Sequence, residues 1–320
     1  MKILVTGGAG FIGSHIVEHY QGRAEEIRVL DNLRTGYRRN LDGLEHTYIE
    51  GSITDRELVK RAVEGVDLVF HMAAMVSVPE SMSKPGECVD INVHGLLNVL
   101  EEASAAGVRK LVFASSAAVY GDNPVVPKLE TMLPEPKSPY AITKLDGEYY
   151  LGMFEREGLL ETAAIRFFNV FGPRQDPTSP YSGVLSIFCR AALTGQPCRI
   201  HGDGEQTRDF IYVTDVVRAN LQAAGIPAAT CATHPILNIG RGQQTSLNQI
   251  IATLRDLLGR PIPVVHDAPR PGDIRHSQAD ISRARAALRW TPQVTLHDGL
   301  AHTLNWFKQQ SPEGNRLPSP

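Results

Sequence analysis

The chain has 320 residues, of which 42% are hydrophobic and 21% charged, and its 32 basic and 35 acidic residues give a net charge of −3. This length exceeds one ordinary core and fits a large domain with a smaller partner. A charge balance this even lacks the basic footprint of a nucleic-acid-binding protein and the polybasic patch of a membrane-surface protein, so we expect neither nucleic acid nor a membrane as a partner.

The first half of the chain alternates short apolar runs with longer amphipathic stretches. Such alternation with short connections is typical of an α/β fold with a Rossmann-type, doubly wound parallel sheet. We predict strands at Ile3–Val5, Ile27–Leu30, Val66–Phe70, Leu111–Ala114 and Ala163–Phe168. We predict helices at Gly13–Gln21, Asp55–Gly65, Cys88–Gly107 and Pro139–Arg156.

The pattern changes after Gly172, where a turn-rich loop is followed by shorter, mixed elements. These predict a smaller α/β C-terminal domain for substrate binding. Phe210–Val213 and Asp215–Ala224 predict a strand and a helix that return to the large sheet. The expected division is residues 1–168 with a returning segment at about 209–235, residues 169–208 and 236–310 as the second domain, and a frayed tail at 311–320.

The first predicted strand leads into a glycine-rich loop, Thr6–Gly13, that opens the first helix. Gly7, Gly10 and Gly13 allow a tight turn, close approach of the backbone to a pyrophosphate, and close packing of helix on strand. The free N–H groups of the helix N-terminus would face the phosphates. This context predicts a dinucleotide site.

Asp31 follows the second strand at about the 20-residue offset expected for the acid that binds the adenosine ribose. A carboxylate there repels a 2′-phosphate, which favours NAD over NADP. Arg34, Arg38 and Arg39 point weakly to NADP, and we interpret them as a solvated basic loop because Asp31 occupies the deciding position.

Tyr140 and Lys144 are spaced i, i+4, which puts both on one face of the helix that begins near Pro139. A nearby ammonium favours the phenolate form of a tyrosine, which can then accept a proton from a substrate hydroxyl. Ser116 stands at the carboxyl end of a predicted strand, where ligands bind in open parallel sheets, and can share that proton. We predict these three residues as the catalytic group.

Together these motifs resemble the extended short-chain dehydrogenase/reductase superfamily, and specifically its NAD-dependent UDP-sugar 4-epimerases. Three later segments carry the same resemblance: Arg166–Gln175, Gly202–Phe210 and Arg270–Ser277. The resemblance implies cofactor contacts at Gly7, Gly10, Phe11, Ile12, Gly13, Asp31, Asn32, Ser52, Ile53, Ala73, Ala74, Tyr140 and Lys144.

The resemblance implies the following chemistry. C4 of a UDP-sugar is oxidised to a transient ketone, and the sugar then turns to present its other face. Reduction of that face inverts the configuration at C4, and the tightly bound NAD is regenerated in each turnover. Related dehydratases and decarboxylases carry acidic residues after the active-site hydroxyl, where this chain has Ala117 and Ala118. Alanine cannot transfer a proton, so the pair favours epimerisation over elimination.

The resemblance also implies the substrate contacts. Arg208 and Arg270 would clamp the diphosphate, because guanidinium groups match phosphate oxygens. Ser277 matches a gatekeeper position where a small residue leaves room for an acetamido group, so UDP-GlcNAc and UDP-GalNAc are expected substrates beside UDP-glucose and UDP-galactose. The remaining expected contacts are Ser77, Val78, Ser116, Asn169, Gly183, Val184, Phe188 and Asp273. For the apolar ones, a place in the core is nearly as good an interpretation.

Two residues depart from the family pattern. Ser52 replaces the aspartate that contacts adenine, and Val76 replaces a lysine that some members place against the phosphates. Cofactor affinity is therefore open. Alternative functions are a UDP-glucuronate-type 4-epimerase, another nucleotide-sugar-modifying enzyme of the superfamily such as a keto-sugar reductase, and a non-enzymatic nucleotide-binding scaffold.

Four cysteines, Cys88, Cys189, Cys198 and Cys231, lack the spacing of a zinc site or a disulfide framework, and no histidine cluster has metal spacing. No apolar stretch is long enough for a signal peptide or a membrane span. We expect a cytoplasmic enzyme without a metal. The family resemblance also implies a homodimer, formed through the helices at Cys88–Ala106 and Pro139–Arg156.

Overall fold

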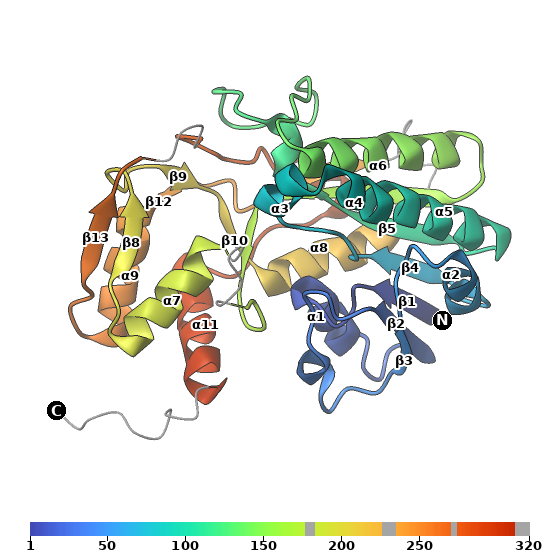
Figure 1. Ribbon diagram of the computed structural model, residues 1–320, viewed down its shortest axis with the longest axis horizontal. Coiled ribbons are helices and arrows are strands. Elements are labelled where there is room, and N and C mark those ends of the chain that lie inside the picture. The colour runs from blue at the N-terminus through green and yellow to red at the C-terminus, as the bar shows by residue number, and fades with distance from the viewer. Residues whose placement is uncertain (177–182, 226–234, 270–273, 311–320) are drawn as a thin grey trace.

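The computed structural model describes residues 1–176, 183–225, 235–269 and 274–310. Its centre is a seven-stranded parallel sheet with the strand order β11-β6-β5-β4-β1-β2-β3, flanked by helices (Figure 1). The reversal of direction beside β1 is that of a doubly wound Rossmann fold, which confirms the predicted fold class. The strands are β1 (Lys2–Thr6), β2 (Glu26–Asp31), β3 (Thr47–Glu50), β4 (Leu68–His71), β5 (Lys110–Ser116), β6 (Glu161–Phe167) and β11 (Ile236–Ile239).

Helices cover both faces of this sheet, so its strands are apolar on both sides. Along β1, Leu4 packs into the cluster beneath α2, α5 and α6, whereas Ile3 and Val5 pack into the cluster beneath α1, α8 and α10. One face is covered by α2 (Arg56–Val63), α5 (Gly95–Ala105) and α6 (Pro139–Arg156), the other by α1 (Phe11–His19), α8 (Val213–Gly225) and α10 (Ser282–Leu288).

A third apolar cluster holds the other end of the molecule together, on the left in Figure 1. Phe188, Ile250 and Leu304 are fully buried in it, one from each of its three helices. Three two-stranded sheets belong to this part: β7 with β10, β9 with β12, and β8 with β13. The elements are β7 (Asn169–Phe171), α7 (Val184–Thr194), β8 (Cys198–His201), β9 (Thr207–Arg208), β10 (Phe210–Tyr212), β12 (Thr245–Ser246), α9 (Leu247–Leu258), β13 (Val264–Asp267) and α11 (Leu296–Gln310).

The returning segment differs from the prediction. Its strand, β10, does not join the large sheet but pairs with β7, because Phe210 and Tyr212 pack into the third cluster. Only its helix α8 returns to the large sheet. The seventh strand of that sheet is β11, which pairs with β6 and lies in the range we had assigned to the second domain.

Three local features were missed. The edge strand β3 is poorly buried and carries almost no apolar pattern. The short helix α3 (Val78–Ser83) follows Ser77, whose Oγ accepts a hydrogen bond from the Glu80 N–H. The long helix predicted at 88–107 is instead α4 (Pro85–Val89), a π-helical segment (Asp90–His94) and α5. Inserted π-turns of this kind occur often beside functional sites.

Among the described residues, no helix is long and apolar enough to cross a membrane. The same part of the chain holds no group of three His, Cys, Asp or Glu side chains that could bind a metal ion.

His71 ends β4 beneath the carboxyl edge of the sheet and is 1% exposed. Its Nδ1 lies 3.0 Å from the Thr6 hydroxyl, and its ring stacks on Phe113. Burial, with a smaller contribution from the Lys144 charge, lowers the pKa of His71 to about 3. The imidazole is therefore neutral in the folded protein at every pH near neutrality.

This histidine makes stability depend on pH. In the unfolded chain His71 has a pKa of about 6.5 and becomes protonated below it, whereas in the folded protein it stays neutral. The unfolded state therefore binds one more proton at low pH, and the free energy of unfolding falls as the pH falls. We expect His71 alone to contribute a loss of about 2 kcal/mol between pH 7.5 and pH 5. Chemical denaturation at both pH values measures the fall in the free energy of unfolding between them. In His71→Gln this fall should be smaller than in the wild-type protein by about 2 kcal/mol. An unchanged pH dependence in the variant would contradict the assignment.

Candidate active site

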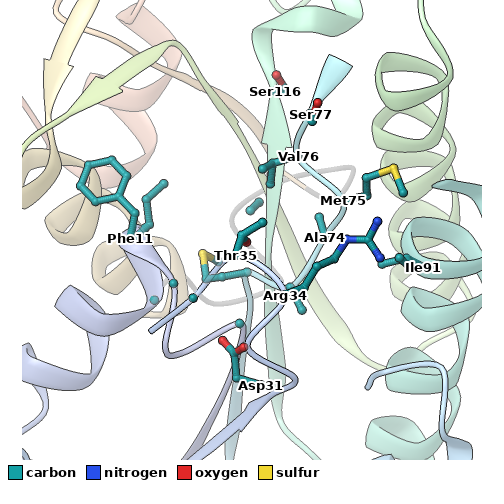
Figure 2. A pocket seen from close by; sticks show the side chains of 18 of the residues that line it. Phe11, Asp31, Arg34, Thr35, Ala74, Met75, Val76, Ser77, Ile91 and Ser116 are labelled. Carbon is teal, nitrogen blue, oxygen red and sulfur yellow. The ribbon is translucent and has the colours of Figure 1, made fainter. Parts of the chain in front are cut away.

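A cavity of about 440 Å³ opens at the carboxyl ends of β1, β2, β4 and β5. Figure 2 shows Asp31 and Ser116 toward opposite ends of it, so it suits an extended ligand. The predicted residues that line it are Gly7, Gly10, Phe11, Ile12, Gly13, Asp31, Asn32, Ser52, Ile53, Ala73, Ala74, Ser77, Ser116, Tyr140, Lys144 and Gly183.

The glycine loop has no room for side chains. Gly7 has a φ of +68°, and a Cβ there would lie 2.7 Å from the Ala73 nitrogen. A Cβ at Gly13 would lie 2.3 Å from the Gly7 carbonyl oxygen. Gly10 caps α1 without a side-chain hydrogen bond, which leaves the first N–H groups of the helix available to a ligand. This is the cradle that a pyrophosphate requires.

Asp31 ends β2 at the other side of this loop, nearly buried. Its carboxylate accepts hydrogen bonds from the N–H groups of Ala9, at 2.9 Å, and Leu33, at 2.7 Å. Burial raises the pKa of Asp31, and these two hydrogen bonds oppose the rise. The carboxylate thus both holds the loop and faces the cavity.

The basic residues that follow Asp31 are engaged with other side chains. Arg34 lies 2.5 Å from the Glu87 carboxylate and 2.8 Å from that of Glu80. Arg38 pairs with Glu50 and stacks over Tyr48, and Arg39 stacks over Tyr37. The carboxylates compensate the charges of Arg34 and Arg38 near the cavity, which agrees with a site for NAD.

The predicted catalytic residues meet at the cavity. Helix α6 begins directly at this edge because the Ser138 hydroxyl accepts a hydrogen bond from the Ala141 N–H and Pro139 occupies the first turn. Tyr140 then lies close enough to the Ser116 hydroxyl for that hydroxyl to affect its pKa. One turn later, the buried Lys144 ammonium lies 5.8 Å from the centre of the Tyr140 ring and donates to the Ala114 carbonyl at 2.7 Å.

This geometry suits proton transfer at a hydroxyl. Burial raises the pKa of Tyr140, while the neighbouring Ser116 hydroxyl acts in the opposite direction. Burial also lowers the pKa of Lys144 to about 8, so its ammonium is still largely charged at neutral pH. A charged ammonium on the same helix face favours the phenolate that a tyrosine base needs.

Only some of the expected substrate residues lie at the cavity. Ser77 and Gly183 line the cavity, but Val78, Asn169, Val184, Arg208 and Ser277 do not. Phe188 is 1% exposed within the third cluster, a position that the core interpretation explains. Arg270 and Asp273 lie outside the described residues.

Arg208 and Ser277 lie close together beyond the cavity. The Arg208 guanidinium donates to the carbonyls of Thr207 and Ile274, at 2.9 and 2.7 Å. The Ser277 N–H donates to the Thr207 carbonyl at 3.1 Å. Two residues far apart in the chain are thus joined through β9.

The cavity also has lining residues that the sequence did not identify as contacts. Thr35 and Gly36 follow Asp31 in a turn, a signal that was available. Glu80 and Ile91 come from α3 and from the π-helical segment, neither of which was predicted. Gln175 had no local signal beyond the family motif that contains it.

A phosphate cradle joined to a Ser–Tyr–Lys group defines a dinucleotide-dependent enzyme of the short-chain dehydrogenase/reductase class. Residues 3–240 match the model of the NAD dependent epimerase/dehydratase family. The UDP-glucose 4-epimerase of Mycolicibacterium smegmatis is 39% identical over 317 residues, which cover 97% of this chain and 100% of that one.

Two solved structures are also similar. A Thermotoga maritima UDP-glucose 4-epimerase with UDP-glucose is 40% identical, with a TM-score of 0.91 over 97% of this chain and 99% of that one. A UDP-N-acetylglucosamine 4-epimerase from Methanobrevibacter ruminantium in complex with UDP-N-acetylmuramic acid is 37% identical, with a TM-score of 0.90 and the same coverage. The chain belongs to the NAD dependent epimerase/dehydratase family and is an NAD-dependent enzyme.

The cradle makes a direct prediction for cofactor retention. Gly13→Val places branched carbons where even a Cβ lies 2.3 Å from the Gly7 carbonyl, so the loop must open and lose its hold on a pyrophosphate. We expect less than about a tenth of the NAD that the wild-type protein retains after purification, measured on acid-released nucleotide. Gly225→Ala, at the end of α8, is a control outside the loop, since its φ is not in the left-handed region and a Cβ there meets no atom within 4 Å. Full retention of NAD by Gly13→Val would contradict the prediction.

Proposed function

We propose that the protein is a 4-epimerase of UDP-sugars that accepts UDP-GlcNAc and UDP-GalNAc, and also UDP-glucose and UDP-galactose. The observation that carries this proposal is the meeting of Ser116, Tyr140 and Lys144 at the cavity, with alanines at positions 117 and 118. The first three residues supply proton transfer at one hydroxyl. The two alanines supply no acid or base for the loss of water or carbon dioxide.

Each of these side chains has one task in the proposed reaction. Bound NAD supplies a reversible two-electron oxidant for the sugar carbon. Tyr140 removes the proton of the 4-hydroxyl and returns it after the sugar has turned. Ser116 hydrogen-bonds the same oxygen, and the Lys144 ammonium stabilises the phenolate between the two transfers.

The cofactor would be held by residues already described. The N-terminus of α1 and the glycine loop would bind the pyrophosphate, and Asp31 the adenosine ribose. Ser52 also lines the cavity, where its hydroxyl accepts hydrogen bonds from the N–H and the hydroxyl of Thr54. The serine that replaces the family's aspartate therefore already has hydrogen-bond partners within its own turn.

The UDP part of the substrate would lie toward the second part of the chain. Arg208 and Arg270 are proposed to bind the diphosphate, together with Asn169, Asp273, Gly183, Val184 and Phe188 for the nucleotide and Ser77 and Val78 for the sugar. The similar T. maritima protein was solved with UDP-glucose, which supports this class of substrate.

The proposal is tested by supplying purified protein with UDP-GlcNAc and UDP-glucose separately and resolving the products by chromatography. We expect the 4-epimer of each sugar without net consumption of added NADH. Tyr140→Phe should lower kcat by at least about 100-fold, because the proton acceptor is lost. Stoichiometric NADH consumption would indicate a reductase, and an epimer formed only from a UDP-uronate would indicate the glucuronate-type activity. Absence of a 4-epimer from every UDP-sugar would refute the proposal.

Ser277 is the proposed determinant of sugar size. The similar structures include a UDP-glucose and a UDP-N-acetylglucosamine 4-epimerase, so both sugars occur among proteins of this fold. Ser277→Tyr should fill the space for an acetamido group and lower kcat/KM for UDP-GlcNAc by about 10–100-fold. For UDP-glucose the change should stay within about threefold, and Ser277→Ala should leave both substrates active. Equal losses for both sugars in the tyrosine variant would contradict the assignment.

We also propose a homodimer formed through α4, α5 and α6, which lie together on one side of the molecule (Figure 1). These helices expose apolar side chains that include Val89, Ile142, Tyr149 and Met153. Sedimentation equilibrium should give about twice the chain mass of 35.0 kDa. Tyr149→Glu should shift the mass toward one chain, since it places a charge in the contact. A single-chain mass for the wild-type protein would exclude this assembly.

A further inference from the structure

A buried polar row runs across three neighbouring strands behind the catalytic residues. Ser115 on β5, Arg166 on β6 and Asn238 on β11 are partners in register across the sheet. All three are at most 2% exposed. Most side chains of the sheet are apolar, and this row includes a fully buried arginine, whose charge must be compensated within the protein.

Glu148 of α6 faces this row and is 1% exposed. Its carboxylate accepts two hydrogen bonds from the Arg166 guanidinium, at 2.8 and 2.6 Å, and one from the Ser115 hydroxyl at 2.6 Å. Burial disfavours the charge on Arg166, but the Glu148 carboxylate outweighs this effect and raises the pKa of the guanidinium. The Arg166 guanidinium is therefore charged, and each of its three nitrogens has a hydrogen-bond partner.

Stability alone does not account for such a pair. Removing two charges from water costs about as much as their attraction returns, and well-packed apolar replacements are often as stable or more stable. Helix α6 also has ample apolar contact with the sheet through Leu151 and Phe154. What an ion pair adds to apolar packing is direction, because its hydrogen bonds exist at one register only.

That register fixes the catalytic geometry. Tyr140, Lys144 and Glu148 stand four residues apart on α6, and they hold three consecutive residues at the end of β5. Lys144 donates to the Ala114 carbonyl, Glu148 accepts from the Ser115 hydroxyl, and Tyr140 lies beside Ser116. Tyr140 and Lys144 line the cavity, and so do all three of these β5 residues, whereas Glu148 does not. Glu148 lies one turn farther along the helix, where it can anchor α6 without touching a ligand.

We propose that Glu148, held by Arg166, is a positioning residue that fixes α6 on the end of β5 and so keeps Tyr140 and Ser116 aligned for proton transfer. The proposal rests on the proposed 4-epimerase function for its kinetic test. A shift of about 1 Å between reacting groups can cost up to about 100-fold in rate, so a small slip of the helix would matter.

The main test uses variants that remove the anchor but not the packing. Glu148→Gln alone leaves Arg166 buried without its counter-charge and can unfold the protein, so the pair is replaced together as Glu148→Met with Arg166→Met. We expect this variant to remain folded and to retain NAD. Its kcat should fall by at least about tenfold, while KM for the UDP-sugar stays within about twofold.

Two single variants make the test specific. Ser115→Ala removes only the hydroxyl that Glu148 holds, and should lower kcat by about threefold in the wild-type background and have no effect in the Glu148→Met/Arg166→Met background. Tyr120→Phe is the matched control. It removes the hydroxyl that accepts from Arg166 at 2.9 Å on the far side of the row, and leaves the Glu148–Ser115 hydrogen bond in place. Its kcat should equal that of the wild-type protein.

A folded, NAD-loaded double variant with wild-type kcat would overturn the proposal, as would a Ser115→Ala effect that is the same in both backgrounds. If the double variant fails to fold, Ser115→Ala alone decides, and an unchanged kcat overturns the proposal. If the wild-type protein forms no epimer, the kinetic test cannot be made, and hydrogen exchange tests the positioning role separately from the proposed function. The backbone at 116–120 should exchange faster in Ser115→Ala than in Tyr120→Phe, and equal rates would overturn the positioning role independently of the reaction.

Discussion

Helix α6 lies so close to β5 that a Cβ at Gly147 would come within 2.6 Å of the Phe113 ring. This contact is the constraint on which the site depends. It brings the Lys144 ammonium to the Ala114 carbonyl and buries it, and burial in turn lowers its pKa to about 8. The close packing of α6 on β5 therefore also sets the pKa of Lys144.

The cofactor side of the cavity shows the same coupling of structure and charge. Asp31 uses its carboxylate to hold the backbone of the glycine loop, so the acid proposed to bind the ribose also shapes that loop. Around it, Arg34 is bound by Glu80 and Glu87 from α3 and α4. The loop that follows β2 is thereby joined to the opposite wall of the cavity, and its positive charge is balanced there.

The features that could be predicted from sequence are those with local signals. Spacing alone identified the glycine loop, Asp31 and the Tyr140–Lys144 pair, because a turn, a strand end and one helix face are each determined within a few residues. Strand β11 could not be assigned to the large sheet, since its partner β6 lies about 70 residues earlier in the chain. Arg166 lies in a predicted strand, but nothing in the sequence pairs it with Glu148, and only the fold buries the two together. Phe188 shows a second limit of prediction from sequence, because an apolar residue can line a pocket or lie in the core, and its type does not distinguish the two.

The described structure separates two kinds of residue in space. Ser116, Tyr140 and Lys144 all belong to the large sheet and its helix, whereas Thr207, Arg208 and Ser277 are joined through a small sheet in the other part of the molecule. Under the proposed function, substitutions around β9 would change which sugar is accepted and leave the residues proposed for proton transfer unaltered. The two parts could then diverge separately in evolution. Two solved relatives, at 40% and 37% identity to this chain, carry different sugars in their names.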